Sequence, residues 1–239
     1  MDFSPYGSDF LNEIRSSLEN HNVAHAVAII NDNRYFENLK NNCWDLVPVI
    51  TKYLSSDYEN DKLEVFKGCE ELLNKIAENS NPEEALLQFI EEIEESEDDT
   101  KFVTILFPML KVLQRIPKNR LNSLAWCLNA IQTYLNKIET SGNEKMVFRT
   151  ELLYHDVLRF YDILIPYYSV KLNSSTNKNF PLVICKYLIE LLGRPLGFLN
   201  LTFVEIKSRI RKIAENIVEK VLLVCADPFI YLEMEKVIS

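Results

Sequence analysis

Two histidines, His21 and His25, stand four residues apart near the start of the chain. On one helix this spacing brings both imidazoles to the same face, where they could chelate a metal ion. The zinc-protease pattern needs a glutamate directly after the first histidine, but Asn22 occupies that position and no third ligand is evident. We therefore expect no metal site, and we interpret the two histidines as a capping or half-buried pair.

A third histidine, His155, is followed directly by Asp156, and these are the residue types of a general base and the acid that orients it. Adjacent residues of a helix do not face each other, and the chain has no Gly-x-Ser-x-Gly motif to supply a nucleophile. The 5 glycines are isolated, so no glycine-rich loop is available to bind phosphate. We predict no catalytic residues, no cofactor and a protein that is not an enzyme.

The chain contains 5 cysteines that lie far apart, at Cys43, Cys69, Cys127, Cys185 and Cys225. A metal or redox site would favour a Cys-x-x-Cys pair, which is absent. The odd count and the apolar surroundings indicate buried free thiols that pack as small hydrophobic side chains in a reducing compartment. Because neither a signal peptide nor a long apolar run is present, we expect a location in the cytoplasm, with the nucleus as a second compartment.

The net charge of the chain is −9, which disfavours binding to nucleic acid and to anionic membranes. Two clusters of like charge stand out, an acidic tract at 91–99 and a basic one at 207–212. The acidic tract could bind a basic partner, and the basic cluster could bind an acidic surface. Runs of like charge more often form a solvated helix face, and we favour this interpretation for the acidic tract and for the basic cluster.

Aromatic side chains gather in apolar helical segments. Trp44 and Trp126 are expected to be core anchors, as most tryptophans in such settings are. A tyrosine-rich ridge would serve a protein interface, but core packing is the favoured reading for the aromatic residues of the segment 154–168, which are Tyr154, Phe160, Tyr161, Tyr167 and Tyr168.

The elements that would carry these residues are helices throughout. Apolar residues recur every three or four positions in almost every segment, and only 5 glycines are present among 239 residues, too few for a hairpin-rich β fold. The sharpest helix start is Asn81-Pro82, with an N-cap side chain followed by a proline at the first helical position. We predict about 11–12 helices in a single all-α domain over 1–239, with N-terminal helices in 1–36 and a polar loop at 172–179 inside the array.

Three prolines, Pro48, Pro108 and Pro166, each lie within an apolar run that otherwise reads as a helix. An interior proline removes a helical hydrogen bond and costs about 3 kcal/mol. Its recurrence in the same setting predicts a kinked helix that is used repeatedly. The expected architecture is a degenerate HEAT/armadillo-like helical-repeat solenoid, in which each helix pair packs only on its neighbours.

Several segments, taken in order, resemble the glomulin family, which includes the plant aberrant root formation protein. They are NNCWDLVP at 41–48, Leu72-Leu73 followed by NPEEALL at 81–87, LFPMLKVL at 106–113 and DPFIY at 227–231. The resemblance implies a non-enzymatic HEAT-like protein that works by binding. Glomulin-like proteins restrain cullin-RING ubiquitin ligases by covering the RING-box subunit, and they are also associated with FK506-binding immunophilins.

The family proteins are considerably longer than this chain, and their RING-box contact lies in a C-terminal part without a counterpart here. We therefore expect the N-terminal half of such a protein or a short isoform, and no RING-contact residue can be carried over. Two alternatives stay open: a generic HEAT-like adaptor in transport or signalling, and a metal-dependent enzyme that would use His21, His25 and a distant carboxylate.

Overall fold

The structure of the chain is a computed structural model that describes residues 6–32, 34, 43–54, 62–96, 99–117, 120–139, 144–169, 187, 204–224 and 232. Within these residues it contains helices and no strand, so the predicted all-α class is confirmed. The elements are α1 (Tyr6–Glu19), α2 (Val23–Ile30), the 3-10 helix η2 (Cys43–Leu46), α4 (Val47–Leu54), α5 (Lys62–Asn79), α6 (Pro82–Glu94), α7 (Asp99–Arg115), α8 (Leu121–Glu139), α9 (Glu144–Ser169) and α11 (Val204–Val224).

The number of helices predicted from the sequence is larger than the number described. The structure describes nine α-helices and one 3-10 helix, and the helices predicted after Phe180 and after Asp227 lie almost wholly outside the described residues. The polar loop at 172–179 lies outside them as well. None of the described helices is long and apolar enough to cross a membrane.

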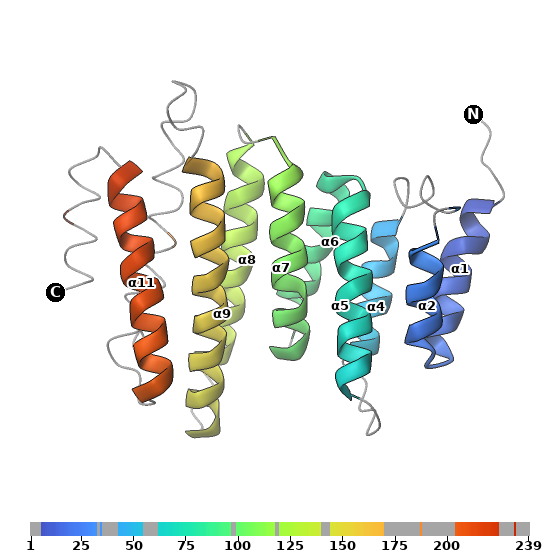
Figure 1. Cartoon of the computed structure of the whole chain (residues 1–239), viewed down its shortest axis with the longest axis horizontal. Helices are drawn as coiled ribbons and strands as arrows, with labels where there is room; N and C mark the ends of the chain where they lie inside the picture. The colour runs from blue at the N-terminus through green and yellow to red at the C-terminus, as the bar shows by residue number, and fades with distance from the viewer. Residues whose placement is uncertain are drawn as a thin grey trace. The chain divides into compact units, whose positions relative to one another are not determined.

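The chain divides into two compact units, Met1–Ile116 and Pro117–Ser239. In the first unit the helices pack in two rows. The helices α2, α5 and α7 form one row, and α1, α4 and α6 form the other, with α4 and α6 behind α5 and α7 in Figure 1. The core between the rows is apolar, and its largest fully buried side chains include Phe10, Phe89 and Phe102.

A glycine allows two helices of the first row to approach closely. A Cβ atom added to Gly68 of α5 would lie 2.1 Å from Cγ1 of Val23 on α2. Since no such contact is sterically allowed, a side chain at position 68 would push the two helices apart. Gly68 therefore fixes the spacing between α2 and α5.

The start of α6 follows the chemistry that the sequence predicts. Asn81 is the N-cap, its side-chain oxygen accepts from the Glu83 amide at 3.0 Å, and Pro82 occupies the first turn. The preceding turn is held by Arg115 at the end of α7, whose guanidinium donates to the carbonyls of Ala77 and Ser80, both at 2.6 Å. The position of α6 is thus set both by its own cap and by α7.

The three prolines differ in their helical positions. Pro108 lies inside α7 and is buried, as predicted. Pro48 is instead the second residue of α4, directly after the 3-10 helix η2, so the expectation of an interior kink there is wrong. A proline in the first turn removes no helical hydrogen bond, and its fixed φ angle suits that position. Pro166 lies within the bounds of α9, and a kink there stays a prediction.

In the second unit, α9 packs against α8 and α11. The predicted apolar stripe of α8 is buried at Leu124, Leu128 and Leu135. Among the α11 side chains that the structure describes, Ala214 and Ile217 are buried, while Ile213 from the predicted stripe is only half-buried. Asp162 of α9 accepts hydrogen bonds from Asn216, at 3.1 Å, and from Lys220. This polar contact fixes the register of α9 against α11.

Candidate protein-binding surface

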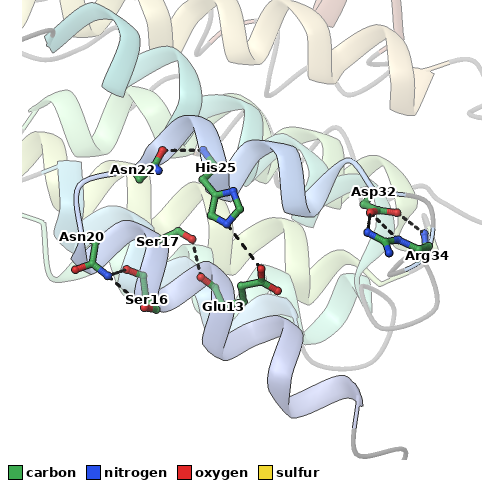
Figure 2. Close-up of polar contacts among 8 residues, drawn as sticks. All are labelled: Glu13, Ser16, Ser17, Asn20, Asn22, His25, Asp32 and Arg34. Atoms are coloured by element: carbon green, nitrogen blue, oxygen red, sulfur yellow. Dashed lines mark hydrogen bonds and ion pairs between the residues drawn. The ribbon is translucent and has the colours of Figure 1, made fainter.

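His21 and His25 do not form a chelating pair. His21 lies in the turn between α1 and α2 with a positive φ of 59°, and its ring stacks on Tyr53 with centroids 5.8 Å apart. His25 lies on α2, where its Nε2 is 3.7 Å from Glu13 Oε1, and the N-cap between the two histidines is Asn22 (Figure 2). The chelating geometry requires one helix, and a left-handed residue before the cap interrupts it. Both histidine side chains are exposed, so the prediction of a half-buried pair is wrong. The prediction that a histidine caps the helix is wrong as well, because the N-cap is Asn22.

In the residues that the structure describes, no group of three or more His, Cys, Asp and Glu could hold a metal ion. The metal-enzyme hypothesis was built on a chelating pair of His21 and His25, and that pair is not formed.

His155 and Asp156 do touch each other, contrary to the expectation for adjacent helical residues. Their Nδ1 and Oδ1 atoms are 3.3 Å apart, and both side chains are about one-quarter exposed. The expectation from the helical spacing was wrong because the short Asp156 side chain reaches Nδ1, the ring nitrogen of His155 nearer to the backbone. The absence of catalysis stays a prediction.

Three of the cysteines are free and buried, as expected. Burial raises the pKa of the Cys43 and Cys69 thiols to about 12, and it also raises the pKa of Cys127. These thiols therefore stay protonated at neutral pH and are poor nucleophiles. Cys185 and Cys225 lie outside the described residues.

The predictions for the aromatic residues are confirmed at some positions and wrong at others. Tyr154, Phe160 and Tyr161 are fully buried, which confirms core packing over an interface ridge for these three. Trp126 on α8 is 55% exposed, so its assignment as a core anchor is wrong. The buried face of α8 passes through Cys127 and Leu128, which leaves position 126 on the outer side of the helix. Trp44 is half-buried.

The basic cluster behaves as a solvated face at its described side chains. Arg209, Arg211 and Lys212 are exposed on α11. The Arg211 Nε lies 2.9 Å from the Glu215 Oε1, one helical turn further on. Exposed pairs of this kind contribute little to stability.

A buried ion pair joins three helices, and it was not predicted from the sequence. Glu92 of α6 lies 2.5 Å from the Nζ of Lys101 on α7, and these side chains are only 8% and 13% exposed. The hydroxyl of Thr51 on α4 donates to the same carboxylate oxygen. The apolar spacing of α6 could have predicted that Glu92 is buried, because Glu92 stands three residues after the buried Phe89 and therefore lies on the same face. Because Glu92 belongs to the acidic tract, it was interpreted as part of a solvated face instead.

The opposite face of α6 is the best candidate for a binding surface. It carries five exposed glutamates around one exposed leucine, and we call these six residues the α6 surface: Glu83, Glu84, Leu87, Glu91, Glu94 and Glu95. The side chain of Leu87 is 48% exposed. The Oε2 of Glu91 accepts from Gln88 at 3.3 Å, and the other glutamates project from neighbouring turns.

The chemistry of the α6 surface suits a basic protein partner. Carboxylates that project from one helix steer a positively charged surface toward it, and an apolar side chain at the centre can enter a recess on the partner. The N-cap at Asn81 and the buried pair of Glu92 with Lys101 hold the helix in one orientation. The acidic residues were seen in the sequence, but the exposed leucine among them was not.

The chain matches the protein family described as YAP/Alf4/glomulin over residues 37–181. The match contains η2 and α4 to α9, and thus the whole α6 surface. Three of the four segments that resemble glomulin also lie within it, and DPFIY at 227–231 lies outside. No curated protein and no solved structure matches the chain significantly. Since the family match covers more than half of the sequence, the chain belongs to the YAP/Alf4/glomulin family.

Proposed function

We propose that the chain is a non-enzymatic binding protein of the glomulin type that modulates a cullin-RING ubiquitin ligase through its RING-box subunit. Family membership supports this proposal, because glomulin-like proteins restrain these ligases. An FK506-binding immunophilin is a second proposed partner, and the proposed location is the cytoplasm, with the nucleus as a second compartment.

The observation that carries a binding function is the α6 surface. Leu87 is 48% exposed and stands among five exposed glutamates. About half of Leu87 is left in contact with water, whereas its neighbour Leu86 is almost fully buried. Covered by a partner, the same side chain would lose its contact with water, which favours association. We therefore assign the α6 surface to partner binding.

The proposed scaffold is a HEAT/armadillo-like helical array. Support comes from the first unit, where successive helices pack on near neighbours in two rows (Figure 1). Such arrays present a row of helix faces to a partner without any change of fold. The α6 surface would be one face of this kind.

Binding of the purified chain to a purified cullin–RING-box complex tests the proposal. We expect reversible binding and slower ubiquitin transfer by the ligase. Leu87→Ala and Glu91→Lys should each weaken binding at least tenfold. Glu19→Lys on α1 is the matched control, because Glu19 is also exposed and the charge change is the same. No binding by the wild-type chain would exclude the α6 surface as a ligase-binding site, and no binding by a longer form that also carries the C-terminal part would refute the ligase function.

The second candidate function is a generic HEAT-like adaptor in transport or signalling. The name of the matched family also refers to the kinetochore, which favours an adaptor in a chromosome-associated assembly. The two functions separate in a ubiquitin-transfer assay, because an adaptor that binds elsewhere leaves the ligase rate unchanged.

A further inference from the structure

The outward face of α5 carries a shallow hollow between Lys67 and Glu78. A surface hollow of about 350 Å³ is lined only by residues of this helix, which are Lys67, Glu70, Glu71, Asn74, Lys75 and Glu78. They form two rows with four-residue spacing, 67–71–75 and 70–74–78. Rows of this spacing are the ridges of a helix surface, and the groove between them is where another helix places its own ridge.

Some of the charges that line this groove lack partners within the described part of the chain. Glu71 accepts from Asn31 at 2.7 Å, and Glu78 pairs with Lys111 at 2.7 Å. No hydrogen bond or ion pair to another described residue involves the side chain of Lys67, Glu70 or Lys75. These three groups can therefore pair with a second molecule at no loss of internal contacts.

The order of the charges is self-complementary when the helix is reversed. Around a two-fold axis between positions 72 and 73, Lys67 faces Glu78 of a second copy, and Glu70 faces Lys75. The remaining pair is Glu71 with Asn74, in which the amide can donate to the carboxylate. Every charged residue of the groove thus meets an opposite charge or an amide, and no like charges meet.

We propose that a second copy of this chain docks on this face, with the two α5 helices antiparallel. An interface of this kind is isologous, so each pair occurs twice across the axis. Leu63, which is 65% exposed, lies one turn before Lys67 on the same stripe. About the same axis it would lie just past the C-terminal end of the partner's α5, where it would add apolar contact at both ends of the pair. The dimer is independent of the proposed ligase function.

The dimer is weak and reversible, because exposed ion pairs contribute little affinity. They fix register and orientation instead. The net charge of −9 on each copy opposes association, but at physiological salt it is screened beyond about 8 Å. Groups in direct contact across the axis are screened much less.

Sedimentation velocity of the full chain at physiological salt, over rising concentration, tests the dimer. We expect the mass to rise from 27.9 kDa toward twice that value. Glu70→Lys and Lys75→Glu should each weaken the dimer at least tenfold, since each turns two attractive pairs into repulsive ones. The double variant should restore it, because the pairs are then reversed rather than lost.

The two single variants shift the net charge in opposite directions, so a common loss of dimer cannot come from overall repulsion. Glu19→Lys on α1, in the other row of helices, is the control and should leave the dimer unchanged. Thermal unfolding of each variant confirms that it is folded. A wild-type chain that stays monomeric, single variants that dimerise normally, or a double variant without recovery would each overturn the proposal.

Discussion

The two sides of α6 use the same residue types in opposite surroundings. Leu86 is 2% exposed and packs in the core, whereas Leu87 is 48% exposed. Glu92 is buried and paired with Lys101, whereas its neighbour Glu91 is exposed. Residue type therefore does not decide the role of a side chain on this helix. The direction in which it leaves the helix does, so that one side packs in the fold and the other is exposed to solvent.

The largest effect should come from the buried ion pair. Glu92→Ala leaves the Lys101 ammonium buried without its partner, and we expect a loss of about 3–5 kcal/mol in the free energy of unfolding. Glu91→Ala, one position earlier, should change that free energy by at most about 0.5 kcal/mol. Urea denaturation of both variants measures the difference.

A rescue variant separates the ion pair from the packing around it. Glu92→Leu combined with Lys101→Met removes both charges and retains the buried volume, so it should recover most of the lost stability. Equal losses for Glu91→Ala and Glu92→Ala would mean that the two sides of α6 do not differ in their contribution to the fold.

The two leucines give the second comparison. Leu86→Ala creates a cavity in the core and should cost about 2–5 kcal/mol, while Leu87→Ala should cost about 0.5 kcal/mol or less. The midpoints of thermal unfolding report both values. A large loss for Leu87→Ala would place this side chain in the core and remove the basis of the α6 surface.

An exposed ion pair between α5 and α7 tests whether burial explains the large stability effect expected for Glu92 and Lys101. Lys111 of α7 pairs with Glu78 of α5 at 2.7 Å, and both side chains are more than 40% exposed. Because water solvates both groups, Lys111→Ala should cost at most about 1 kcal/mol. A loss as large as that of Glu92→Ala would show that exposure does not govern the strength of these pairs.

The sequence could predict features that depend only on residues close together in the chain. The cap at Asn81 depends only on the residues that follow it, and it is confirmed. The burial of Leu128 follows from the spacing along a single helix and is confirmed too. The glomulin resemblance was also carried by ordered local segments, and the family match bears it out.

Features that depend on other helices could not be predicted. The partner of Glu92 lies on α7, and nothing near Glu92 in the sequence indicates Lys101. Trp126 is exposed because its neighbours in the sequence take the buried face of α8. Pro48 was assigned to a helix interior because the 3-10 turn before it has no clear sequence signal.

Affinity for a purified cullin–RING-box complex, measured side by side for the wild-type chain, Leu87→Ala and Leu86→Ala, tests most directly whether the α6 surface binds the ligase. We predict that Leu87→Ala loses at least tenfold in affinity with unchanged stability, while Leu86→Ala loses stability but retains its affinity at temperatures where it is folded. Binding by the wild-type chain that Leu87→Ala leaves unchanged, or no binding at all, would contradict this role of the α6 surface.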